Sequence, residues 1–188
     1  MKQFKGRVIV AGTCQAEALV SHGGFNTLAS YQMAIMFGDK QVKCGDQNNP
    51  DLYKKPMIGK ALCLPQTIGS TTGGMVLFTV CAVGKQPACM LFSKPIDSLA
   101  ASGAILGEVW TDSKMPVVDS LGDEFLDYVQ TGMTVSVGAG GVVDQQRHGV
   151  ARRAQSHHVG QLAGVHGLAL DRAHGHPGPL CHQPPGQL

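Results

Sequence analysis

A polar loop between two apolar runs holds the residues of this chain that could do chemistry. The loop reads Gly69-Ser70-Thr71-Thr72-Gly73-Gly74, after the apolar run 61–64 and before the apolar run 75–83. A strand, a loop and a helix are therefore expected in that order. Such a loop brings backbone N–H groups and hydroxyls to the N-terminus of a helix, where they favour an anion such as a carboxylate or a phosphate.

Two familiar phosphate-binding patterns do not fit this loop. No lysine follows its glycines at the spacing of a P-loop, and the pattern GxGxxG is absent. The same residues also fit a purely structural loop in which a Ser or Thr caps the following helix. The residues alone leave both an anion site and a helix cap open.

A second loop, Ser21-His22-Gly23-Gly24-Phe25-Asn26-Thr27, also combines glycines with polar side chains. Gly-Gly and Asn supply positive φ angles at low cost, so a simple turn is its plainest interpretation. His22 is the only histidine before residue 148, and a lone loop histidine is expected to be solvated.

Composition narrows the class of protein. The 188 residues are 43% hydrophobic, which is enough for a real core, and only 15% charged, against about 25% in ordinary domains. So few charges predict that part of the surface is covered by a partner. The net charge of +2 gives no argument for nucleic acid, and no apolar run approaches the ~18 residues of a membrane span. A cytoplasmic protein is expected.

The cysteines do not predict a metal site. No CxxC motif and no zinc-finger spacing occurs among the six. Cys14, Cys63, Cys81 and Cys89 lie in or beside apolar runs, so buried free thiols are expected. Cys44 follows polar residues and is the only cysteine that we single out for a chemical role.

The remaining pattern predicts an α/β domain with a mixed sheet or barrel and flanking helices. Strands are expected over 6–12, 16–20, 60–64, 88–93 and 115–119, and a final hairpin over 133–137 and 141–143. Helices are expected over 73–83, 96–110 and 123–129, the second capped by Asp97 or Ser98 and the third ended by Thr131-Gly132. The polar connection 38–58 is expected to be irregular and either functional or partner-facing.

The chain changes character at its end. Residues 146–188 hold seven of the eight histidines and many glycines and prolines, with irregular spacing that argues against a metal site. We expect a domain over 1–145 and a flexible tail over 146–188 without an assigned function.

Taken together, the domain resembles the small, swivelling domain of the aconitase X family over about residues 5–144. The carriers of the resemblance are Val8-Ile-Val10, the loop from Val20 to Thr27, the segment from Lys60 to Gly74, Pro87-Ala-Cys-Met-Leu-Phe92, and Pro95-Ile-Asp-Ser-Leu-Ala-Ala-Ser-Gly-Ala104. Ordered matches in several segments are harder to obtain by chance than one loop. Members of this family are hydro-lyases, and some pair a small subunit of this size with a large catalytic subunit.

The resemblance implies a substrate, and it implies which subunit holds the iron–sulfur cluster and most of the substrate pocket. The branch that dehydrates mevalonate 5-phosphate has a first loop of the type Ser-Phe-Trp-Gly-Gly-Val-Asp-Pro. The loop here lacks the Trp and the Asp-Pro, which favours the branch that dehydrates cis-3-hydroxy-L-proline to pyrroline-2-carboxylate. The iron–sulfur cluster and most of the pocket are expected on the large subunit, with this chain inactive alone.

The resemblance also implies roles for single residues. Dehydration beside a carboxylate needs a base for the α-proton and an acid for the leaving hydroxyl. Ser70 occupies the position of the serine that acts as base in aconitase-like enzymes. Its neighbours Gly69, Thr71 and Thr72 would shape a cradle for the substrate carboxylate, and Ser21 and Asn26 would face it from the first loop. The competing interpretations are a regulatory anion-binding module and a structural subunit whose loop serine only caps a helix.

Overall fold

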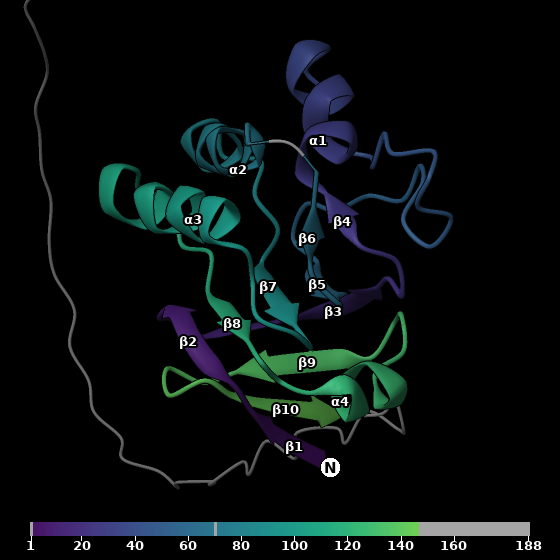
Figure 1. Ribbon diagram of the computed structural model, residues 1–188, viewed down its shortest axis with the longest axis vertical. Helices are drawn as coiled ribbons and strands as arrows, with labels where there is room; N and C mark the ends of the chain where they lie inside the picture. The colour runs from purple at the N-terminus through teal and green to yellow at the C-terminus, as the bar shows by residue number, and fades with distance from the viewer. Residues whose placement is uncertain (1, 70, 147–188) are drawn as a thin grey trace, which may run out of the picture. The chain divides into compact units, whose positions relative to one another are not determined.

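Two sheets and four helices are built from the part of the chain that the computed structural model describes, which is residues 2–69 and 71–146 (Figure 1). The strands are β1 (Lys2–Lys5), β2 (Arg7–Val10), β3 (Cys14–Val20), β4 (Phe25–Asn26), β5 (Ala61–Leu64), β6 (Thr67–Ile68), β7 (Cys89–Phe92), β8 (Val117–Asp119), β9 (Thr134–Val137) and β10 (Val142–Gln146). The helices are α1 (Thr27–Met36), α2 (Gly73–Ala82), α3 (Ser98–Trp110) and α4 (Asp123–Tyr128).

The large sheet has the strand order β1-β10-β9-β3-β5-β7-β8-β2. Its centre is parallel, because β3 pairs with β5, β5 with β7 and β7 with β8 in the same direction. The flanks are antiparallel through β1, β10 and β9 on one side and β2 on the other. The expected mixed sheet is confirmed.

One bent segment at the N-terminus nearly closes this sheet into a barrel. β1 and β2 form its two opposite edges, although only Gly6 separates them in sequence. The amide of Gly6 donates to the carbonyl of Gly141 at 3.0 Å. A Cβ at Gly6 would lie 2.4 Å from the carbonyl oxygen of Asp119, so only glycine fits this corner.

Alternation along the central strands produces two separate cores. In β5, Ala61 and Cys63 point to the core enclosed by the curved sheet, while Leu62 and Leu64 point to the core under the helices. α4 contributes Phe125 to the enclosed core. The strands are apolar on both faces because each face is buried.

Three helices form a layer over the outer face of the parallel strands (Figure 1). α2 and α3 approach so closely that a Cβ at Gly103 would lie 2.0 Å from the carbonyl oxygen of Gly74. Glu108 is the single charged residue within α1, α2 and α3. A surface helix normally carries charges on its outer face, so this layer is unusual for an isolated domain.

Several expected boundaries need correction. The first strand does not begin at Gly6, because Lys2–Lys5 already pairs with β10. Helix α4 ends at Tyr128 rather than at Thr131-Gly132, and the Thr131 hydroxyl accepts instead from the amide of Val20 at 3.0 Å. Helix α1 was not expected at all. The helices α2 and α3, the Asp97 cap and the closing hairpin agree with the sequence.

The connection 38–58 is irregular, as expected, but much of it is packed inside. Val42, Cys44, Leu52 and Met57 are buried in the core under the helices. Among the described residues, no helix is long and apolar enough to cross a membrane. The expected boundary at 145 lies within β10, and the expected tail lies outside the described residues apart from Gln146.

Candidate active site

The candidate site lies where three parallel strands end. β3, β5 and β7 run in the same direction, and each leads through a loop into one helix: α1, α2 and α3 respectively. Loops that follow parallel strands meet at the carboxyl edge of the sheet, which is the usual place for ligands in α/β folds. The short sheet of β4 and β6 joins the first two loops, with Phe25 opposite Thr67 and Asn26 opposite Ile68.

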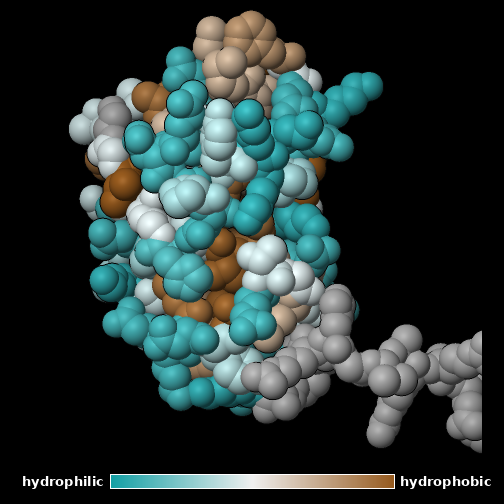
Figure 2. Space-filling view, turned by 90° about the vertical axis from the view of Figure 1, so that its right-hand side faces the viewer, coloured by the Kyte–Doolittle hydropathy of each residue, from teal (hydrophilic) through white to brown (hydrophobic). Residues whose placement is uncertain are grey.

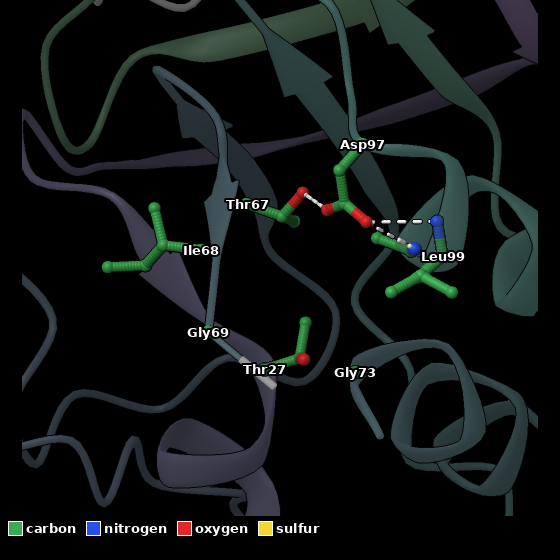
Figure 3. A pocket seen from close by; sticks show the side chains of 8 residues that line it. Thr27, Thr67, Ile68, Gly69, Gly73, Asp97 and Leu99 are labelled. Carbon is green, nitrogen blue, oxygen red and sulfur yellow. Dashed lines mark hydrogen bonds between the residues drawn. The ribbon is translucent and has the colours of Figure 1, made fainter. Parts of the chain in front are cut away.

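A small cavity of about 210 Å³ opens between these loops (Figure 3). The N-terminal residues of the three helices line it together with β6. The lining residues are Thr27, Thr67, Ile68, Gly69, Gly73, Asp97, Leu99 and Ala100. The N-termini of three helices therefore face one space, and a helix N-terminus without a capping side chain favours a small anion.

The three helices begin differently around this cavity. The Asn26 side chain caps α1 by accepting from the amide of Ala29 at 3.1 Å. The Asp97 carboxylate caps α3 by accepting from the amides of Leu99 at 2.9 Å and Ala100 at 3.0 Å. Thr72 is the N-cap of α2, and its side chain makes no capping bond. Of the three helices, only α2 has an N-cap residue whose side chain does not cap the helix.

Asp97 is the charged group of the cavity. One of its oxygens caps α3, and the other accepts a hydrogen bond from the hydroxyl of Thr67 on β6 (Figure 3). Partial burial raises the pKa of Asp97, but the bonds from Thr67 and the helix amides outweigh that effect and leave the pKa below its usual value. The carboxylate is therefore charged at neutral pH.

Glycines allow the loops to meet so closely. Gly69 has a φ of 109°, and a Cβ there would lie 3.1 Å from the Asn26 side chain. A Cβ at Gly73 would lie 2.7 Å from the Thr27 hydroxyl oxygen. The predicted cradle residue Gly69 and the candidate Asn26 are thus brought side by side.

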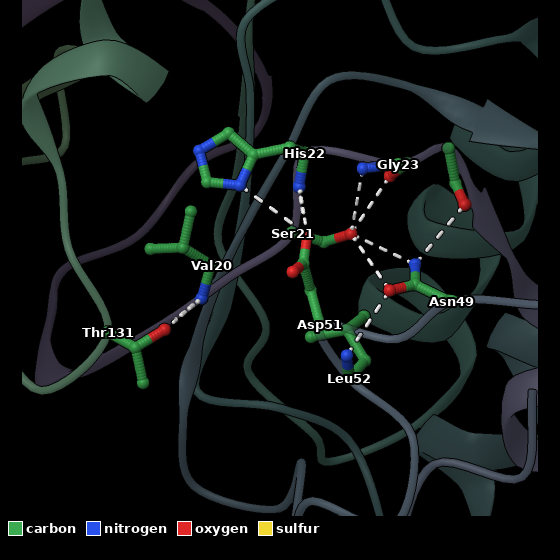
Figure 4. A network of polar contacts seen from close by, with 9 residues as sticks. Val20, Ser21, His22, Gly23, Asn49, Asp51, Leu52 and Thr131 are labelled. Carbon is green, nitrogen blue, oxygen red and sulfur yellow. Dashed lines mark hydrogen bonds and ion pairs between the residues drawn. The ribbon is translucent and has the colours of Figure 1, made fainter.

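The other predicted site residues have different surroundings. Ser70 lies outside the described residues. It follows Gly69, which lines the cavity, and Thr71 and Thr72 beyond it are exposed. Ser21 is fully buried, and its hydroxyl forms a network with Asn49 and the backbone of Gly23 (Figure 4).

That network holds the first loop against the connection 38–58. The Asn49 amide nitrogen donates to the Ser21 hydroxyl at 2.9 Å, and the amide of His22 donates to Asp51 at 2.8 Å. The His22 ring is largely exposed, as expected, and lies 3.4 Å from the same carboxylate. Ser21 is engaged in this loop contact, and it is absent from the lining of the cavity.

Comparison with known proteins identifies the domain. Residues 3–145 match the model of the aconitase X swivel domain. The chain belongs to the aconitase X swivel domain family. The phosphomevalonate dehydratase small subunit of Methanosarcina mazei is 28% identical over 148 residues, which cover 78% of this chain and 93% of that protein.

Two further relatives widen the comparison. The cis-3-hydroxy-L-proline dehydratase of Pseudomonas aeruginosa is 29% identical over 119 residues, which cover 63% of this chain but 19% of that protein. The crystal structure of the holo-form of Thermococcus kodakaraensis aconitase X has a chain with a TM-score of 0.64 and 26% identity, covering 78% of this chain and 100% of that one. The homologues of this swivel domain are dehydratases.

This swivel domain does not offer ligands for an iron–sulfur cluster within its described residues. They contain no group of three or more His, Cys, Asp or Glu side chains that could hold a metal ion. Cys63 and Cys89 are buried within the enclosed core, where burial raises the pKa of the Cys63 thiol. The described residues do not fit a cluster, so no step of the chemistry is assigned to one here.

Cys44, the cysteine singled out from the sequence, is buried rather than displayed on a polar loop. It lies in the core under the helices with 1% of its surface exposed, and burial raises the pKa of its thiol. A neutral, inaccessible thiol is a poor nucleophile. We therefore assign no chemical role to Cys44.

Three residues of the cavity were missed as site residues. Thr27 and Thr67 lie in segments singled out from the sequence but were not named as site residues, and the local pattern marked Asp97 only as a helix cap. The signal that could have found them is topological: if β5 and β7 are parallel, the N-terminus of α3 must lie beside that of α2 at one edge of the sheet. These three residues can be recognised as site residues by their position after the ends of parallel strands, and not by their residue type.

Proposed function

We propose that this chain is the small subunit of a cytoplasmic two-subunit hydro-lyase of the aconitase X type, which dehydrates cis-3-hydroxy-L-proline to pyrroline-2-carboxylate. The observation that carries the proposal is the cavity at the carboxyl edge of the parallel strands, bounded by Gly69 and by the start of α2. A cavity of about 210 Å³ suits a small carboxylic acid. The family of the domain supports the reaction class.

In this proposal Ser70 removes the proton from C2 of the substrate. The electron pair of that C–H bond forms the C2–C3 double bond, and the hydroxyl on C3 leaves with a proton as water. The resulting enamine takes a proton at C3 and releases the proton on its nitrogen to become the cyclic imine. A serine alkoxide is costly in water, and the positive end of α2 would lower that cost by stabilising negative charge.

The neighbours of the base have supporting roles. Gly69, Thr71 and Thr72 would bind the substrate carboxylate with backbone amides and hydroxyls, and Asn26 holds the adjoining start of α1 through its cap on Ala29. The acid that assists the leaving hydroxyl and the iron–sulfur cluster that the family resemblance implies are proposed to lie on the large subunit, because the described residues offer no cluster ligands.

The surface supports a partner of this kind. Large apolar side chains are exposed along the helical layer, among them Met36, Phe37, Val109 and Trp110, the last with 69% of its surface exposed. The end of α1 forms the apolar top of the face in Figure 2. Large exposed apolar patches mark interaction sites, and several relatives are named as small subunits.

Mevalonate 5-phosphate is the second candidate substrate. Most of the named relatives are phosphomevalonate dehydratase small subunits, at 24–29% identity. The first loop favours the hydroxyproline branch, because the Trp and Asp-Pro of the other branch are replaced here by His22 and by Asn26-Thr27. In the alternative without catalysis, this domain is a regulatory module that binds an anion. A structural subunit whose loop serine only caps a helix is the third alternative.

Co-expression with the large subunit tests the proposal. The complex would be purified anaerobically and assayed with cis-3-hydroxy-L-proline and mevalonate 5-phosphate in parallel. We expect turnover of the first, and a loss of at least about 10³-fold in kcat with Ser70→Ala while the complex still forms. Ser136→Ala, on strand β9 and outside the cavity, is the matched control. Turnover of mevalonate 5-phosphate without turnover of cis-3-hydroxy-L-proline would reject the proposed substrate. Full activity of Ser70→Ala would reject Ser70 as the base.

A further inference from the structure

The charge of the cavity carries information about its ligand. Asp97 is the one carboxylate among the described lining residues, and none of those residues is Lys, Arg or His. Thr67 lies beside Asp97, and Thr27 and Gly69 lie across the space from it (Figure 3). A ligand that enters this space therefore meets a fixed negative charge on the α3 side.

The geometry leaves that charge available to a ligand. Asp97 Oδ1 accepts both amides of the α3 cap, at 2.9 and 3.0 Å, and the second oxygen accepts one bond from the Thr67 hydroxyl. A carboxylate oxygen can accept two bonds, so the second oxygen keeps capacity for another donor. No described cation forms an ion pair with Asp97.

We propose that Asp97 is a specificity-determining residue that binds a cationic nitrogen of the substrate. The inference rests on the proposed function and deepens it, because it names the side chain that recognises the nitrogen of a small zwitterionic imino or amino acid. A secondary ammonium next to Asp97 would form a charge-assisted hydrogen bond. A phosphate at the same position would meet like charge without a compensating side chain from the described lining.

Two ligands isolate this effect. L-Proline and (S)-tetrahydrofuran-2-carboxylate share the ring and the carboxylate, but the first has a cationic nitrogen where the second has a neutral oxygen. Their binding to the anaerobically purified complex would be measured by isothermal titration calorimetry. We expect the wild-type complex to bind L-proline at least about tenfold more tightly.

The variant Asp97→Asn removes the charge and keeps the cap, because Asn is as good an N-cap as Asp. We expect it to lose most of the preference for L-proline while its affinity for the furan acid changes little. Asp39→Asn is the matched control, since Asp39 also accepts two backbone amides, those of Gln41 and Lys43, but lies away from the cavity. The control should keep the wild-type preference.

The outcomes separate this inference from the proposed function. No preference for L-proline in the wild-type complex, or the same preference in Asp97→Asn, overturns the role of Asp97 even if cis-3-hydroxy-L-proline is turned over. Conversely, a preference that depends on Asp97, without dehydration of that substrate, upholds the inference and rejects the proposed reaction. Loss of binding of both ligands in Asp97→Asn would show a structural role and also overturn it.

Discussion

Asp119 is the residue on which the closure of the sheet depends most directly. Its side chain is fully buried at the end of β8, opposite Arg7 of β2. Its oxygens accept from Arg7 Nε at 2.9 Å, from Arg7 Nη2 at 2.6 Å and from the amide of Ile96 at 2.9 Å. One carboxylate thus holds a sheet edge and the approach to α3 together.

Replacing this carboxylate should destabilise the fold. In Asp119→Ala the buried amide of Ile96 loses its acceptor, which costs about 1–3 kcal/mol of the free energy of unfolding. Chemical denaturation at pH 7 would measure the loss. Exposed Asp112→Asn is the control and should change the free energy of unfolding by less than about 0.5 kcal/mol. Equal stability of the two variants would contradict the role of Asp119.

The same carboxylate predicts a dependence of stability on pH. Burial raises the pKa of Asp119, but the bonds from Arg7 and Ile96 outweigh it and leave the pKa lowered in the folded state. A lowered folded pKa stabilises the protein fully above the unfolded pKa of about 3.9, and the contribution is lost as the pH falls toward the folded pKa. We expect the slope of stability against pH below about 4 to be shallower in Asp119→Ala than in the wild type.

At the scale of elements, the contact between α2 and α3 leaves no room for side chains. Ala is normally better than Gly inside a helix by about 1 kcal/mol. Here a Cβ at Gly103 would meet the Gly74 carbonyl oxygen at 2.0 Å, so we expect Gly103→Ala to destabilise by about 1–3 kcal/mol instead. Gly140→Ala, where nothing lies within 4 Å, is the control for thermal unfolding. A stabilised Gly103→Ala would show that the helices separate freely.

Some elements could be predicted from the sequence and others could not, for physical reasons. Local sequence signals predict four elements, β5, α2, β7 and α3. Apolar runs, glycines and a capping Asp97 mark where they begin and end. α1 shows no such pattern, since Met33, Met36 and Phe37 are apolar yet exposed, which removes the contrast between its two faces. β1 has one buried apolar residue, Phe4, and is fixed by β10, a partner strand more than 130 residues later in the sequence.

The site shows the same division. The loop at Gly69 and the start of α2 were predictable, because local residue types define a strand, a turn and a helix. The meeting of Thr27, Thr67 and Asp97 was not, because it depends on β3, β5 and β7 being parallel neighbours. Sequence reasoning located the parts of the site and could not supply the strand order that assembles them.

At the scale of the whole molecule, the sequence predicts a domain over 1–145 and a tail after it. Both cores and all eight strands of the large sheet lie before residue 147. We therefore expect a chain cut after residue 146 to keep its melting temperature within about 2 °C in circular dichroism. A chain cut after residue 140 loses β10, the partner of β1, and should not fold cooperatively. A large drop in melting temperature for the first truncation would place essential contacts in the removed residues.

The bent N-terminal segment has a consequence for how the chain is made. Lys2 and Arg7 leave the ribosome more than a hundred residues before their partners Gln145 and Asp119. Contacts between such distant positions slow folding, and strand edges that wait for partners are open to other nascent chains. β1 and β2 therefore cannot take their places in the sheet until β10 and β8 have been synthesised.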